Sequence, residues 1–229
     1  MKKTRNNKKL IEKIDISKKY EPIDAIKILK ENSYTKFDEA LEIAINLGID
    51  PNKTDQNIRG AVSLPKGTGK KIKVAVVAKS DKQAEAKEAG ADVVGENDLI
   101  ETISKGNLNF DLIIATPEMM PSIGKVAKIL GPKGLMPNPK LGTVTDDIKT
   151  AVTDAKSGQV QFRNDKAGII HAGIGKMSFN ENDLLENLKS FFISISKSKP
   201  ESAKGSFIKK VTIASTMGVG LVINEASLR

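Results

Sequence analysis

Two hydrophobic patterns divide the chain. In its middle, short continuous apolar runs alternate with polar helical stretches. The runs predict strands at 72–78, 92–94 and 111–115, and the stretches predict helices at 80–89, near 96–104 and from Pro117 onward. Continuous apolar runs are typical of parallel strands that are buried on both faces. The middle of the chain is therefore predicted to be a small doubly wound α/β unit.

The flanking regions show alternating strands with one buried face instead. Apolar and polar residues alternate around 41–47, 160–162, 211–213 and 219–223. Helices are expected at 22–31, where Pro22 occupies the tolerated first turn, and at 183–196, where Leu, Phe and Ile form one apolar face. Such α+β elements on both sides of the middle predict one discontinuous domain, closed by antiparallel pairing of strands from both ends of the chain. Its predicted segments are 1–67 and 159–229, with the α/β unit inserted at 68–158.

Charge and aromatic residues follow the same division. The chain has 229 residues and a formal net charge of +9. Residues 68–158 hold 13 basic and 12 acidic side chains, whereas the flanks hold 24 and 16, together with all the aromatic residues except Phe110. A positive excess raises the local concentration of polyanions. An anionic partner is therefore expected for the discontinuous domain.

Several function classes are excluded by composition. Because the chain has no Cys, it cannot form a disulfide, a thiol nucleophile or a zinc site of the Cys type. The single His171 cannot supply a cluster of imidazole ligands, and any Ser-His-Asp mechanism would have to use it. The apolar stretches, of about five residues, are far shorter than the roughly 20 that span a bilayer. The basic residues 1–9 lead into an amphipathic segment rather than a signal peptide. We expect a cytosolic protein without metal, cofactor or membrane.

Two segments resemble nucleotide-binding motifs but depart from them. Residues 67–71 look like the end of a phosphate loop, yet Leu64 stands where Gly is needed, and Lys71 stands where a hydroxyl residue is needed. Residues 78–81, after the first strand of the middle, lack the glycines of a dinucleotide site. We interpret 67–71 as a charged linker. The alternative is an enzyme that uses a nucleotide or small molecule at the ends of the parallel strands, near Lys79 or Thr116.

Residues 131–142 form an unusual loop with three Gly, three Pro and two Lys. Three prolines forbid a helix or an inner strand, so a stiff ordered loop is expected, with Lys133 and Lys140 protruding. Loops of this length are uncommon in compact domains unless they are functional.

Three short segments in the flanks carry side chains suited to nucleic acid: 36–39, 163–166 and 215–218. Lys and Arg neutralise phosphate, Phe packs on sugar or base, hydroxyls reach the 2′-OH, and Gly allows close approach. The closed topology is expected to bring all three to one end of one sheet. His171, in a strand at 168–176, is expected to serve structure or an RNA contact rather than catalysis. A basic protein that binds nucleic acid without selectivity is a further alternative.

Four segments carry a family resemblance: KFDEALEIAINLGID at 36–50, GPKGLMPNPKLGTVT at 131–145, GQVQFRNDKAGIIHAGIGKMSF at 158–179 and ASTMGVGLVI at 214–223. Together they resemble the bacterial large-subunit ribosomal protein L-one family, over nearly the whole chain and in the same order. The resemblance implies a split ferredoxin-like (β-α-β) domain built from both termini, with an inserted Rossmann-like, doubly wound three-layer domain.

The resemblance also implies a function without catalysis or cofactor. Members are structural constituents of the large ribosomal subunit that bind the mobile stalk of its rRNA and assist release of deacylated tRNA from the exit site. They can repress translation of their own mRNA through its leader, and are monomers when free of the ribosome. The implied RNA contacts are Lys36, Phe37, Glu39, Arg163, Lys166, His171, Ser215, Thr216, Met217 and Gly218. Secondary contacts are implied at Lys133, Gly134 and Lys140.

Overall fold

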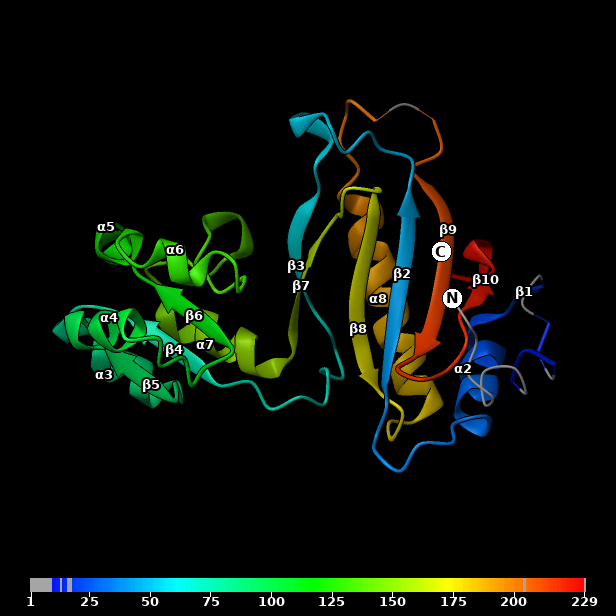
Figure 1. Cartoon of the computed structure of the whole chain (residues 1–229), viewed down its shortest axis with the longest axis horizontal. Helices are drawn as coiled ribbons and strands as arrows, with labels where there is room; N and C mark the ends of the chain where they lie inside the picture. Colours follow the sequence, from blue (N-terminus) through cyan, green and yellow to red (C-terminus); the bar gives the residue numbers. More distant parts are fainter. Residues whose placement is uncertain (1–9, 13, 16–17, 204, 229) are drawn as a thin grey trace. The chain divides into compact units, whose positions relative to one another are not determined.

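The chain forms two compact units, Met1–Gly69 with Val160–Arg229, and Lys70–Gln159. The structure is a computed structural model that describes residues 10–12, 14–15, 18–203 and 205–228 (Figure 1). The basic residues 1–9 lie outside the described residues. The domain bounds expected from the sequence, 1–67 with 159–229 and 68–158, stay a prediction.

The first unit contains a five-stranded sheet in the order β1-β10-β9-β2-β8. Central β2 is antiparallel to both β8 and β9, and β1 is parallel to β10. Strands from both ends of the chain therefore share one sheet, as the alternating patterns predict. The strand bounds are β1 Lys19–Tyr20, β2 Ala40–Leu47, β8 Ile169–Lys176, β9 Ile208–Ser215 and β10 Leu221–Ile223, and a separate two-stranded sheet pairs β3 (Arg59–Ser63) with β7 (Gln159–Arg163).

Helices α2 (Pro22–Glu31) and α8 (Glu181–Lys197) pack on one face of the five-stranded sheet. Figure 1 shows α8 behind the strands. The alternation in β2 decides which side chains meet them: Leu41, Ile43, Ile45 and Leu47 are buried in the shared core. Glu42, Ala44 and Asn46 point to the opposite face, where they are exposed or half-buried. That opposite face is called the open face below.

The second unit is built on a parallel three-stranded sheet in the order β5-β4-β6. Val74 and Val76 of β4 pack on one face with residues of α3 and α7, whereas Ala75 and Val77 pack on the other with residues of α4 and α5. Both faces of the sheet are thus covered, and the chain is a mixed α/β protein with several sheets. The bounds are β4 Val74–Val77, β5 Val93–Gly95, β6 Leu112–Ala115, α3 Ser80–Glu88, α4 Asn97–Ser104, α5 Met120–Gly124, α6 Ala127–Leu130 and α7 Ile148–Ser157.

The helix expected from Pro117 is broken into pieces. It begins as the 3₁₀ turn η2 (Pro117–Met119) and continues as the short helices α5 and α6. Pro121 has no amide hydrogen to donate to the preceding turn, so η2 does not continue into one long helix, and Pro121 instead lies in the first turn of α5. Further 3₁₀ turns lie at η1 (Thr54–Gln56), η3 (Pro139–Leu141) and η4 (Glu225–Leu228). Among the described helices, none has the length and apolar character needed to cross a bilayer.

Candidate nucleic-acid interface

The turn after β9 and the segment before β2 meet at one end of the sheet. The Thr216 amide donates to the Ala40 carbonyl at 3.1 Å, and the Ala40 amide donates to Thr216 Oγ1 at 3.0 Å. The Tyr34 hydroxyl donates to the Met217 carbonyl at 3.3 Å. Phe37 and Met217 are 56% and 47% exposed on these joined segments. We call this part of the surface, residues 33–40 and 215–218, the turn end.

Beneath the turn end lies a buried carboxylate. Glu39 is 1% exposed and accepts hydrogen bonds from the Ser33 hydroxyl at 3.2 Å and the Met217 amide at 3.5 Å. Burial pushes the pKa of Glu39 upward, but hydrogen bonds from Ser215, Thr35, Met217 and Ser33 together outweigh it, so the pKa is lowered. Ser215 is itself only 5% exposed. Both side chains therefore lie below the surface of the free protein, and the RNA contacts expected for Glu39 and Ser215 stay a prediction.

Tyr34 is a surface residue that was not among the RNA contacts expected from the sequence. Among the described residues, the large hydrophobic side chains that are exposed are Tyr34, Phe37, Ile193 and Met217. Three of these four belong to the turn end. The signal was present in the sequence, since Tyr34 is an aromatic residue three positions before Phe37 in a segment without helical or strand periodicity.

A second cluster surrounds the turn between β7 and β8. Arg163 and Lys166 are exposed there, beside an open hollow of about 460 Å³ that Pro51, Asn57 and Asn164 also line. The Asp165 carboxylate holds the turn by accepting the amides of residues 167 and 169, each at 2.8 Å. The Ile169 amide is the main reason that the pKa of Asp165 is lowered. This cluster, residues 163–166 with His171, is called the basic end below.

His171 lies on β8 with its side chain on the open face, opposite Ala44 of β2. Its ring is 62% exposed, and Nε2 lies 3.8 Å from the Asp165 carboxylate. An exposed imidazole beside one carboxylate is available for a surface contact. Among the described residues no group of three or more His, Asp or Glu side chains could hold a metal ion.

The two clusters lie at opposite ends of β2, so the prediction of one shared end is wrong. Leu41 pairs with Ser215 at the turn end, whereas Asn46 pairs with Ile169 beside the basic end. Five residue steps along a strand correspond to roughly 17 Å. The reason is the antiparallel course of β8, which begins beside the last residues of β2. Between the clusters the open face carries the small residues Ala44 and Gly173, together with the exposed Glu42.

In the second unit, the loop at 131–142 is ordered as expected. Asn138 closes it, since its side chain accepts the Lys140 amide at 2.9 Å and its own amide donates to Thr143 Oγ1 at 2.7 Å. Gly134 has φ +71°, which favours glycine. Lys133, Gly134 and Lys140 are all exposed.

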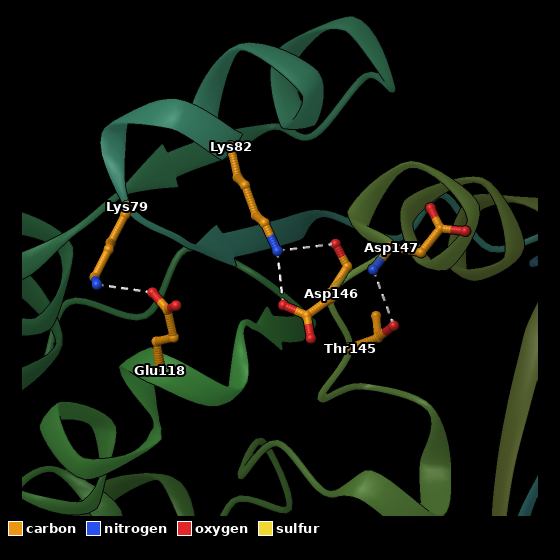
Figure 2. A network of polar contacts seen from close by, with 6 residues as sticks. All are labelled: Lys79, Lys82, Glu118, Thr145, Asp146 and Asp147. Carbon is orange, nitrogen blue, oxygen red and sulfur yellow. Dashed lines mark hydrogen bonds and ion pairs between the residues drawn. The ribbon is translucent and has the colours of Figure 1, made fainter.

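The parallel-strand edge of the second unit, where an enzyme of the alternative class would bind its ligand, is crossed by ion pairs (Figure 2). Lys79 Nζ lies 2.8 Å from the Glu118 carboxylate, and Lys82 Nζ lies 2.6 Å from that of Asp146. The Asp147 amide donates to Thr145 Oγ1 at 3.1 Å in the same network. Carboxylates thus already engage the cations that an anionic ligand would use.

Comparison with known proteins decides against the enzyme alternative. The ribosomal protein L1p/L10e family matches residues 29–219. The chain belongs to this family. It is 57% identical to "Large ribosomal subunit protein uL1" of Rickettsia bellii strains OSU 85-389 and RML369-C, over 91% of this chain and 87% of each relative. Members of the family are structural and non-enzymatic, which rejects the enzyme alternative.

Proposed function

We propose that the first unit binds the mobile stalk of large-subunit rRNA across its open face. One observation carries the proposal: β2 joins two exposed clusters, Phe37 with Thr216 and Met217 at one end and Arg163 with Lys166 at the other. The small residues Ala44 and Gly173 lie between them, beside the exposed Glu42, and allow a folded RNA backbone to approach the sheet there. Family membership supports rRNA as the ligand.

The two ends suit different parts of an RNA. Arg163 and Lys166 at the basic end neutralise phosphates, and exposed His171 adds a donor to phosphate or sugar. Phe37 and Met217 at the turn end offer apolar surface to sugars and bases, while Thr216 and Gly218 allow close approach. Lys36, which is exposed, adds a cation at the turn end.

For the architecture we propose a split ferredoxin-like domain with an inserted Rossmann-like domain. Antiparallel β2, β8 and β9 with helices α2 and α8 on one face support the first assignment. Three parallel strands with helices on both faces support the second. The proposed borders are 67/68 and 158/159.

The wider role is part of the same proposal. On the ribosome in the cytoplasm, the stalk that carries this protein would assist the departure of deacylated tRNA from the exit site. The loop at 131–142, with Lys133, Gly134 and Lys140, would add a secondary RNA contact. The free protein would be a monomer that represses its own mRNA, because a leader of similar shape competes with rRNA for one surface.

Filter binding with a transcript of the bacterial large-subunit rRNA stalk tests this function. We expect tight binding that a large excess of bulk tRNA does not displace, and competition by a transcript of the protein's own mRNA leader. Equal competition by bulk tRNA would instead indicate a basic protein without selectivity. A leader transcript that does not compete would contradict the repressor role and leave the rRNA role standing.

A further inference from the structure

We propose that Glu39 is a positioning residue, which holds the tip of the turn end in its binding shape without touching RNA. The effect of Glu39 on RNA affinity rests on the proposed function, whereas its effect on the shape of the turn concerns the free protein. Glu39 immediately precedes β2, and the turn that it supports follows β9, almost 180 residues later.

The first step is the burial of a charged group. At 1% exposure, the Glu39 carboxylate is desolvated, which is costly unless several donors compensate. Ser33 and Met217 supply two of them, at 3.2 and 3.5 Å, and Ser215 supplies a third. The donors come from both segments of the turn end. One carboxylate thus ties the segment before β2 to the turn after β9.

The second step is the packing above the carboxylate. The Gly218 amide donates to the Ser215 carbonyl at 3.1 Å, which closes the turn. A Cβ atom at Gly218 would collide with the Ser215 hydroxyl. Because that hydroxyl also bonds to Glu39, a side chain at Gly218 would displace one of the groups that link the carboxylate to the turn.

The third step is the consequence for the exposed tip. The carboxylate holds Ser215 and the Met217 amide, so it fixes the turn on both sides of Thr216 and at Met217 itself. A turn that is held before binding loses less conformational entropy when RNA docks. Glu39 therefore acts on affinity through Thr216 and Met217, and its effect depends on their presence.

Hydrogen exchange of the free full-length protein tests the structural part. In Glu39→Gln and in Ser215→Ala, we expect the Met217 and Gly218 amides to exchange roughly tenfold faster than in the wild type, since a donor or acceptor of the network is lost. In Lys166→Ala, at the basic end, and Ile195→Val, on the buried face of α8, these two amides should exchange at the wild-type rate. Unchanged exchange in both network variants would overturn the proposal. Ser215→Ala keeps the test available if Glu39→Gln does not fold.

A double-mutant cycle tests the functional part, with the stalk transcript as the probe. We expect Glu39→Gln to weaken binding about tenfold in the wild type and in Lys166→Ala, but less than about twofold in a Thr216→Val, Met217→Ala background. An equal loss in both backgrounds would refute action through the turn. Failure of the wild type to bind the transcript would refute the proposed function alone, because the exchange measurement decides the positioning role by itself.

Discussion

Thr216 and Ala40 pair through two hydrogen bonds although 176 positions separate them in the chain. The backbone bond continues the pairing of β9 with β2. The bond to the Thr216 hydroxyl adds a side-chain hydrogen bond where the two strands stop pairing. These two bonds hold Met217 beside the segment that contains Phe37. The turn end therefore forms only when segments from both terminal parts of the chain have paired.

Thr216→Val should destabilise the protein as well as weaken RNA binding. Val matches Thr in shape but cannot accept the Ala40 amide, so we expect a loss of about 1 kcal/mol in the free energy of unfolding. Stalk binding should weaken by roughly 1–3 kcal/mol. Denaturant titration and filter binding measure the two effects. Full retention of stability would show that the hydrogen bond between Thr216 Oγ1 and the Ala40 amide contributes nothing.

Phe37→Ala and Met217→Ala should weaken stalk binding with little change in stability. Both side chains are about half exposed, so truncation should alter the free energy of unfolding by less than about 0.5 kcal/mol. Loss of their contact with sugars or bases should cost roughly 1–3 kcal/mol of binding. Ile193→Ala is the matched control, since Ile193 is 44% exposed on α8, which packs on the opposite face of the sheet. If all three variants bind like the wild type, the turn end is not part of the interface.

Arg163→Ala and Lys166→Ala should change the salt dependence of binding. A cation that contacts a phosphate displaces a counterion, and the slope of log K against log salt is therefore negative. Removal of either cation should make this slope less steep by about one. Met217→Ala should leave the slope unchanged, because it removes no charge. Titrations at several salt concentrations measure it. An unchanged slope in both Arg163→Ala and Lys166→Ala would show that neither side chain contacts a phosphate.

The Asp165 carboxylate should make stability depend on pH. Its pKa lies below the ordinary value of 3.8 in the folded protein, chiefly because it accepts the Ile169 amide. The stabilisation is therefore complete above the ordinary pKa and is lost as the pH falls through the lowered one. We expect the thermal midpoint of the wild type to exceed that of Asp165→Asn at neutral pH, and the gap to close in acid. A gap that is constant down to about pH 2 would show that the ionised carboxylate has no role.

A chain in which a short linker replaces residues 68–158 should fold and bind the stalk transcript. The core of the first unit draws on both terminal segments but on no residue of the second unit, so its burial survives the deletion. Circular dichroism and filter binding check folding and function. An unfolded product would refute the discontinuous domain, and a folded product without affinity would assign the main contact to the inserted unit.

Local pattern determined the elements and their buried faces. The helix predicted at 22–31 is α2, with the same bounds, because a proline start and one apolar face need no distant partner to be recognised. The alternation from Leu41 to Leu47 gave the buried face of β2, since successive side chains in a strand point to opposite sides. The residue types of the site segments likewise indicated a nucleic-acid ligand before the fold was known.

Tertiary structure decided where those residues lie. Strand direction and register separate 163–166 from 215–218 along β2, and neither is encoded in the segments themselves. Glu39 looks like any surface acid in the sequence, yet donors from Ser33 and from residues almost 180 positions away enclose it. Burial and hydrogen bonding depend on which residues are neighbours in space. Whether a charged side chain next to a strand faces an RNA ligand or supports a turn from below is therefore decided only when the distant strand has paired.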